Sequence, residues 1–292
     1  MTISDISFAR EQKGHVIALH CSLGSGRQWA KLTEALGPAY RLIAPDIAGY
    51  GDNRAALDLP LTLADEVAFL LDRVDAAGPI HLVGHSYGGA IAFKMATASP
   101  LAGRVRSLTL IEPVLPTLLK ENAADRRLHD LFAQLARNVC AELWRGMSIE
   151  AIDRFMSYWN GSAAAAPLSA EVKLRMIEHI DKLACDFAAA LSEENVAAAA
   201  AGIKPPTLLF SGGLSPYMTQ RIVGRLASLI TDAETHHLPA AGHMLPLTHA
   251  RQINPRISAH IARADDLAGV TLASGFGPDD WSADRALGPA PK

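Results

Sequence analysis

The stretch that decides the fold is Ile80–Ala90, IHLVGHSYGGA, in which a short apolar run leads directly into the pattern Gly-x-Ser-x-Gly. The apolar run predicts a buried strand, and the residues that follow the turn predict a helix. Gly84 and Gly88 remove side chains that would collide in so tight a connection. The pattern is typical of a nucleophile elbow, which presents Ser86 at the carboxyl end of a sheet. A glycine-rich turn with an incidental serine is the plainer alternative.

Composition limits the classes of protein that this chain can represent. It has 292 residues, of which 49% are hydrophobic and 20% are charged, so it can build a large buried core. The length suits one α/β core with an inserted or appended piece. A formal net charge of −3 gives no electrostatic footprint for nucleic acid or for an anionic membrane.

Other features of the chain predict a cytoplasmic location. The three cysteines, Cys21, Cys140 and Cys185, are widely spaced, which argues against a disulfide framework and fits a reducing compartment. The amino-terminal residues do not form a basic stretch followed by an apolar run, as a secretory signal would. The alanine tracts at 163–166 and 197–201 are far too short to span a bilayer.

Strand-like runs alternate with helical patterns over most of the chain, which predicts a mainly parallel sheet with helices on both faces. The predicted strands are Val16–Leu19, Arg41–Ala44, Ile80–Val83, Val105–Ile111, Thr207–Phe210 and Glu234–Leu238. The predicted helices are Gln28–Leu36, Leu63–Ala76, Gly89–Ala98, Pro216–Leu229 and Leu247–Ala262.

The alternation breaks once, between Glu112 and Lys204, where the sequence reads only as helices. Such a segment is too long for a loop in a compact domain, so we expect a helical cap inserted into the core. The predicted organisation is a core formed by residues 1–112 and 205–263, a cap at 113–204, and a tail at 264–292. Trp281 is a candidate for docking the tail onto the body or onto a partner.

Four motifs together resemble the α/β-hydrolase fold family in order and spacing. They are Leu19–Ser25, Pro45–Asp52, Gly84–Gly88 and the pair Gly242-His243. The resemblance implies a doubly wound, mainly parallel sheet with a helical cap after the sixth strand, which would be Val105–Ile111. The usual amino-terminal hairpin would be reduced to one strand near Ile3–Ala9.

The resemblance also implies a set of site residues. Ser86 would be the nucleophile and His243 the general base, since a histidine can take the serine proton and return it to the leaving group. The oxyanion hole would use the backbone N–H groups of Ser22 and Tyr87.

The loop after the first central strand departs from the family. The family usually has His-Gly where this chain has His20-Cys21. We expect His20 to brace the loop by hydrogen bonding. Cys21 is more consistent with a small buried filler than with a reactive thiol.

The sequence departs from the family at the acid of the triad. The family usually places an aspartate in a Gly-x-x-Asp pattern after the seventh strand, and here Ser215 occupies that position. A subset of the family places its acid after the sixth strand, where this chain has Glu112. We therefore assign Glu112 as the orienting acid. It could instead cap a helix or pair with an arginine, and Asp46 and Asp52 are lesser candidates for the acid.

These residues predict a serine hydrolase that cleaves a small to medium ester, lactone or related carbonyl compound through an acyl-enzyme, with no cofactor and no metal. A serine at the elbow disfavours the haloalkane dehalogenase and epoxide hydrolase branches, which use an aspartate nucleophile. A carbon–carbon bond hydrolase would use the same machinery. A ligand-binding or sensor protein on the same scaffold, with slow or absent turnover, is the alternative from another class, because one fold hosts many functions.

The cap is expected to supply a largely apolar pocket for a small-molecule substrate. The sequence allows a homodimer but does not predict one. The cap side chains expected to pack together or to line the pocket are Leu115, Leu118, Leu119, Phe132, Trp144, Phe155, Met156, Tyr158 and Trp159.

Overall fold

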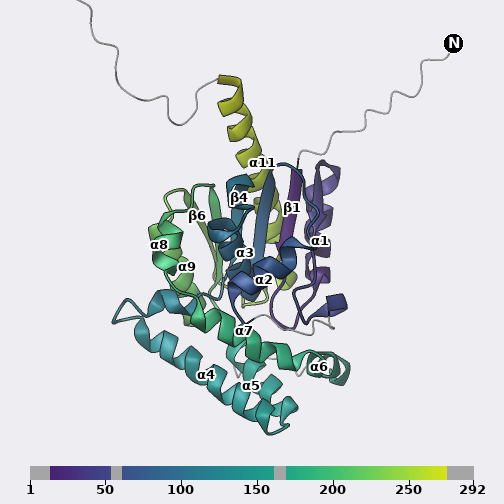
Figure 1. Ribbon diagram of the computed structural model, residues 1–292, viewed down its shortest axis with the longest axis vertical. Coiled ribbons are helices and arrows are strands. Elements are labelled where there is room, and N and C mark those ends of the chain that lie inside the picture. Colours follow the sequence, from purple (N-terminus) through teal and green to yellow (C-terminus); the bar gives the residue numbers. More distant parts are fainter. Residues whose placement is uncertain (1–13, 54–60, 161–168, 275–292) are drawn as a thin grey trace, which may run out of the picture.

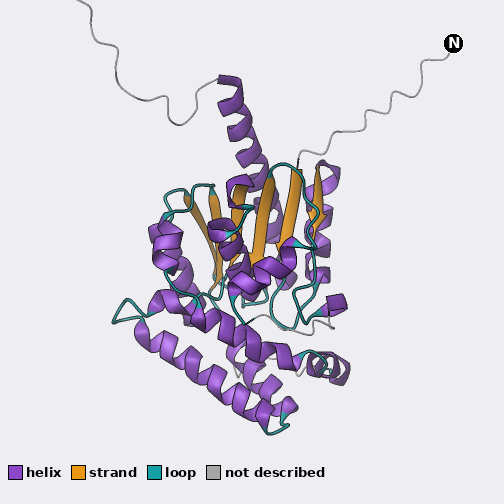
Figure 2. Cartoon of the chain, viewed as in Figure 1, coloured by secondary structure: helices purple, strands orange, loops and turns teal. Residues whose placement is uncertain are grey.

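A computed structural model describes residues 14–53, 61–160 and 169–274 of the chain. Its centre is a six-stranded sheet with the order β2-β1-β3-β4-β5-β6, in which every neighbouring pair is parallel (Figure 2). The strands are β1 Gly14–Leu19, β2 Tyr40–Ile43, β3 Ile80–His85, β4 Val105–Ile111, β5 Thr207–Gly212 and β6 Ala233–Leu238. All six predicted strands are confirmed, while the strand expected near Ile3–Ala9 lies outside the described residues.

Helices cover both faces of this sheet (Figure 1). One face carries α2 Leu63–Leu71, α3 Tyr87–Ala98 and α9 Tyr217–Leu229, and the other carries α1 Ala30–Leu36 and α11 Ala250–Ser274. The doubly wound sheet predicted for the α/β class is confirmed. Short helical turns complete the core, at Gly26–Trp29, Gly37–Ala39, Gly51–Asn53, Ala102–Arg104 and Leu245–Thr248.

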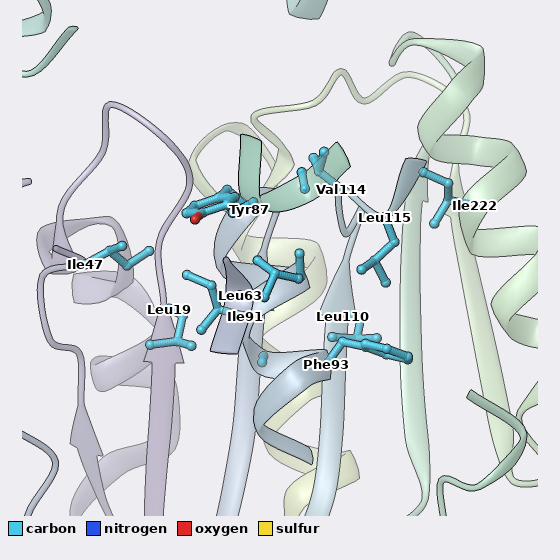
Figure 3. Close-up of a cluster of buried hydrophobic side chains, with 14 of the residues drawn as sticks. Leu19, Ile47, Leu63, Tyr87, Ile91, Phe93, Leu110, Val114, Leu115 and Ile222 are labelled. Carbon is cyan, nitrogen blue, oxygen red and sulfur yellow. The ribbon is translucent and has the colours of Figure 1, made fainter. Parts of the chain in front are cut away.

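The alternation of side chains along each strand builds two separate cores. In β1, Ile17 and Leu19 belong to the core beneath α2 and α3, whereas Val16 and Ala18 pack on the opposite face. Successive strand residues point to opposite faces, so a parallel strand that is covered on both faces is largely apolar. Figure 3 shows the first core, where Leu19 gathers with Ile91 and other side chains of neighbouring elements.

Two helix ends differ from the predictions. Helix α2 ends at Leu71 rather than at Ala76. Helix α11 runs on to Ser274, so the region predicted as tail from residue 264 begins as helix. Ala264 is buried, whereas Leu267, one turn further on, is 53% exposed, so the apolar face weakens there and the sequence carries no clear signal that the helix continues. Trp281 lies outside the described residues.

The segment between β4 and β5 is helical, as predicted. It contains a short turn at Pro116–Leu119 and the helices α4 Arg126–Trp144, α5 Ser148–Asn160, α6 Ala170–Ile177, α7 Ile180–Ser192 and α8 Val196–Ala201. Helices α4 to α7 lie across one end of the sheet, while α8 lies beside α9 (Figure 1). The domain boundaries at 112 and 204 stay predictions.

Most of the expected apolar cap residues are buried, but Trp144 is not. Its side chain is 92% exposed at the carboxyl end of α4, so it belongs neither to the cap core nor to the pocket. Helix α4 is amphipathic and buries Phe132 and Val139 on its inner face. None of the described helices is long and apolar enough to cross a membrane.

Candidate active site

The sharp turn between β3 and α3 places Ser86 between a strand that ends at His85 and a helix that begins at Tyr87. Ser86 has φ +57°, a conformation that L-residues rarely adopt and that the surrounding structure must hold. The turn leaves no room for a side chain at Gly84 or Gly88. A Cβ at Gly84 would lie 2.4 Å from the Gly88 carbonyl oxygen, and a Cβ at Gly88 would lie 2.3 Å from the His20 carbonyl oxygen.

Ser86, His243 and Glu112 form one chain of hydrogen bonds. The Ser86 Oγ lies 2.9 Å from His243 Nε2, and His243 Nδ1 lies 2.6 Å from Glu112 Oε2. All three residues are buried, and Ser86 is only 4% exposed, with Phe155 and Trp159 of α5 lining the cavities beside it. The geometry is that of a nucleophile, a base and a carboxylate that orients the base.

The carboxylate of Glu112 is fixed at both oxygens. Its Oε1 accepts a hydrogen bond from the Gly212 N–H at 2.7 Å, while Oε2 faces the imidazole. Glu112 directly follows β4 and has φ +46°, so its backbone is held in a strained conformation. It neither caps a helix nor pairs with an arginine in the described hydrogen bonds and ion pairs.

The other carboxylates considered from the sequence serve different purposes. Asp46 accepts hydrogen bonds from the N–H groups of Gly26, at 2.7 Å, and of Asp52, at 2.8 Å, and thereby ties two loops together. The Asp52 residue is exposed. Ser215, at the family's usual acid position, has a buried hydroxyl with no hydrogen-bond partner among the described residues.

The two predicted oxyanion donors lie beside the serine. Tyr87 is the first residue of α3, where a backbone N–H has no partner within the helix. Ser22 follows β1 and lines the same cavities as Ser86. Its hydroxyl donates to Asp186 Oδ2 of α7 at 2.5 Å, so the loop is anchored to the cap.

His20 and Cys21 have the structural roles that the sequence suggested. His20 Nδ1 bonds the Cys21 carbonyl oxygen at 2.8 Å, and its Nε2 accepts the Ile47 N–H at 2.9 Å, so the ring bridges two loops. Burial lowers the pKa of His20, which fits a neutral ring. Burial raises the pKa of the Cys21 thiol to about 12, so the side chain is a protonated filler rather than a nucleophile.

Comparison with known proteins decides the family. A family model described as alpha/beta hydrolase fold matches residues 14–250. The chain belongs to the α/β-hydrolase fold family. One relative, provisionally named carbamate hydrolase RutD, from Variovorax paradoxus (strain S110), is 27% identical over 86% of this chain and 92% of its own length. Lipase LipV of Mycobacterium tuberculosis is 35% identical over 34% of this chain and 37% of its own length.

Solved structures agree on the fold of this hydrolase. MenH from S. aureus superposes with a TM-score of 0.64 at 20% identity, covering 87% of this chain and 95% of that protein. An enol-lactonase from Burkholderia xenovorans LB400 superposes with a TM-score of 0.63 at 16% identity, covering 85% and 91%. At such identities the likeness shows the fold alone.

Two cavities of very different size adjoin the hydrolase's serine. One has a volume of about 760 Å³ and is lined by residues that include Ser86, Met156 and His243. The other has a volume of about 20 Å³ and is lined by residues that include Ser86, Tyr87 and Val114 but not His243. Among the described residues, no group of three or more His, Cys, Asp or Glu side chains could hold a metal ion.

The imidazole of His243 lies between two other rings. The indole of Trp159, from α5, stacks on it with ring centroids 4.1 Å apart and planes 19° apart. The His85 ring lies at 4.9 Å, and its Nε2 bonds the His243 carbonyl oxygen at 2.8 Å. Helix α5 therefore contacts His243 directly. The sequence placed Trp159 only among apolar cap residues, because no local pattern links it to His243.

A buried charge cluster also joins the cap to the core beside the serine. Lys182 of α7 is 1% exposed and donates to Glu66 Oε1 of α2 at 2.5 Å and to Asp186 Oδ1. The Tyr87 hydroxyl donates to the same Glu66 oxygen at 3.0 Å, and the Tyr50 hydroxyl donates to Asp186 Oδ2 at 2.6 Å. Sequence analysis missed this cluster, since charges on a helix ordinarily read as a solvated face.

Burial controls the charge state of this cluster. Burial raises the pKa of Glu66 to about 7, against the lowering effect of Lys182. Burial lowers the pKa of Lys182, but Asp186 and Glu66 outweigh it and leave that pKa raised. The Lys182 ammonium group is thus held between the Glu66 and Asp186 carboxyl groups, and helix α7 is fixed to the core at α2 and at the loop that carries Ser22.

Proposed function

We propose that this α/β hydrolase is a serine hydrolase that cleaves a small to medium ester, lactone or related carbonyl substrate through an acyl-enzyme. The observation that carries the proposal is the continuous hydrogen-bonded chain from Ser86 through His243 to Glu112. Carbamates fall within the same carbonyl class, and one relative is named for that activity. The proposal also includes a helical cap at 113–204, a small-molecule substrate, a cytoplasmic location and no cofactor.

Acylation begins when Ser86 Oγ attacks the carbonyl carbon while His243 Nε2 takes the hydroxyl proton. Glu112 stabilises the imidazolium that forms and holds the proton on Nδ1. The carbonyl oxygen becomes an oxyanion, which accepts hydrogen bonds from the N–H groups of Ser22 and Tyr87. Losing one such donor typically costs about 3–4 kcal/mol of transition-state stabilisation.

Collapse of the tetrahedral intermediate breaks the bond to the leaving group, which receives its proton from His243 Nε2. The acyl group stays on Ser86 as an ester. A water molecule then gives a proton to the same nitrogen and attacks the acyl carbon, and a second collapse returns the proton to Ser86 Oγ and releases the carboxylic acid. Nucleophile, base and acid are thereby restored.

The first test is intact-mass labelling of the full-length protein with a fluorophosphonate probe. We expect a single adduct on the wild type and none on Ser86→Ala. Ser228→Ala is a matched control, because Ser228 is an exposed serine of α9 that lines neither of the two cavities at Ser86, and it should label like the wild type. An unlabelled but folded wild-type protein would overturn the proposal and favour a ligand-binding protein on the hydrolase scaffold.

A further inference from the structure

The two cavities at Ser86 are unequal, and their linings give each a different place in the reaction. Both are lined by Ser22, Ser86 and Trp159. The large cavity has a volume of about 760 Å³ and is also lined by His243. The small cavity has a volume of about 20 Å³ and is lined by Tyr87 but not by His243. A substrate bound at Ser86 can therefore extend into either cavity, but only the large one gives access to the base.

Chemistry assigns the two halves of the substrate to these cavities. The leaving group has to receive a proton from His243 Nε2, so it must lie in the cavity that contains His243. The acyl substituent departs from the same carbon in another direction, and the remaining space beside Ser86 and the oxyanion donors is the small cavity. We propose that the small cavity is the acyl site, and that the enzyme prefers short, uncharged acyl groups of about acetyl size on a bulky, apolar leaving group. This inference rests on the proposed serine hydrolase activity.

The size of the small cavity sets the acyl length. A volume of about 20 Å³ is enough for roughly one water-sized group, such as the methyl of an acetyl group. Its walls are packed on one side by aromatic rings, with the Phe132 and Phe187 centroids 5.5 Å apart. On another side lies Asp186, which is held by Ser22, Tyr50 and Lys182. A longer chain would have to break this buried cluster.

The same wall excludes charged acyl groups. Asp186 lines the small cavity with a carboxylate. The nearby Lys182 ammonium is already shared between Asp186 and Glu66. An acyl group that carries its own carboxylate would be buried there beside a like charge, which is strongly unfavourable at low local dielectric.

The large cavity has the properties of an apolar leaving-group site. Its volume of about 760 Å³ is within the range of pockets that hold drug-sized ligands. Its lining includes the flexible apolar side chains Met156, Met176 and Met244. Leu214 and Leu247 also line it and are 67% and 45% exposed, so apolar surface is available to a ligand where the cavity opens.

The test is a series of p-nitrophenyl esters with the full-length enzyme. We expect kcat/KM to fall at least tenfold from acetate to butyrate and further to octanoate. Succinylated substrates should react more slowly still. In a second series of acetates, kcat/KM should rise with the size of the apolar alcohol. An octanoate that reacts as well as acetate, or acetates that do not respond to alcohol size, would overturn the assignment.

Val114→Ala tests the acyl site itself, because Val114 lines only the small cavity of the two. Removing two methyl groups should raise the butyrate-to-acetate ratio of kcat/KM about tenfold, the scale of one methylene in an apolar pocket. Leu247→Ala is the matched control in the large cavity and should leave that ratio unchanged while weakening bulky acetates. An unchanged ratio in Val114→Ala would count against the inference.

Fluorophosphonate labelling separates the two proposals. If Ser86 is labelled but kcat/KM rises with acyl length, the proposed serine hydrolase activity is supported and the assignment of the two cavities is wrong. If Ser86 is not labelled in folded protein, both fall together.

Discussion

Replacing Glu112 by Gln should disable the base while leaving the packing intact. Glu112 Oε1 accepts the Gly212 N–H at 2.7 Å, so the amide oxygen of a glutamine must stay at that position. Its NH2 group then occupies the place of Oε2, 2.6 Å from His243 Nδ1, and donates to that nitrogen. The imidazole is forced to carry its proton on Nε2, where it can no longer accept the proton of Ser86.

The wrong tautomer in a Ser-His-Asp triad lowers turnover about ten-thousand-fold. That factor corresponds to about 5 kcal/mol of activation free energy, at about 1.4 kcal/mol for each tenfold change. We expect a loss of this size in Glu112→Gln. It can be measured as the rate constant for fluorophosphonate labelling of Ser86 and as the hydrolysis of p-nitrophenyl acetate.

A second substitution tests the geometry of the acid. Ser215 has a buried hydroxyl without a partner among the described residues, and that oxygen would lie 3.0 Å from a Cβ built on Gly212. Ser215→Asp therefore places a carboxylate beside the Gly212 backbone, and in the Glu112→Gln background it should recover part of the lost rate. Thermal melting of each variant controls for unfolding. A Glu112→Gln protein that is folded and labels within threefold of the wild type would refute the reasoning.

Three further predictions, each with its own substitution, test other parts of the structure. Trp159→Leu removes the ring that is stacked on His243 and should lower the single-turnover rate constant about tenfold. Trp159→Phe keeps an aromatic ring and should retain more activity. Equal rate constants for the wild type and Trp159→Leu would show that the stack has no role. Burial raises the pKa of Glu66 to about 7 in the folded protein, above its ordinary value of 4.5, so its contribution to stability is fully present below pH 4.5 and is lost as the pH rises through 7. Urea titrations can measure the difference in unfolding free energy between the wild type and Glu66→Gln. This difference should fall as the pH rises from 4.5 to 7, and a difference that does not change with pH would contradict the prediction. Gly88→Ala would place Cβ 2.3 Å from the His20 carbonyl oxygen and should prevent stable folding. Gly224→Ala is the control, because a Cβ at Gly224 meets open space on α9. In thermal melts this variant should be neutral or stabilised by about 0.5–1 kcal/mol.

Much of the fold could be predicted from the sequence because its signals are local. Most of the strands are short, largely apolar runs, and all six predicted strands are confirmed in position. The elbow could be predicted because its glycines are required by contacts within the turn and with the neighbouring strand. The helical insert was visible as a long interval without any strand pattern. The end of α11 was missed, because the helix continues beyond Ala264 with exposed residues such as Leu267, whose exposure no sequence pattern reveals.

The candidate site was only partly accessible from the sequence. Ser86 and His243 lie in recognisable motifs, but the acid had to be chosen among Glu112, Asp46 and Asp52, since a carboxylate carries no local mark of its partner. The structure places Glu112 against a histidine 131 residues away along the chain. It also brings together groups that no sequence pattern connects, such as the indole of Trp159 and the ring of His243.

The sequence by itself thus determined the order of strands and helices, the position of the turn and the serine at its tip, because these depend on neighbouring residues. Only the tertiary structure decided which carboxylate faces the base, how the buried cluster around Lys182 fixes the cap, and how unequal the two cavities at Ser86 are. These features depend on distances between segments far apart in the chain, and the packing of the whole domain sets those distances.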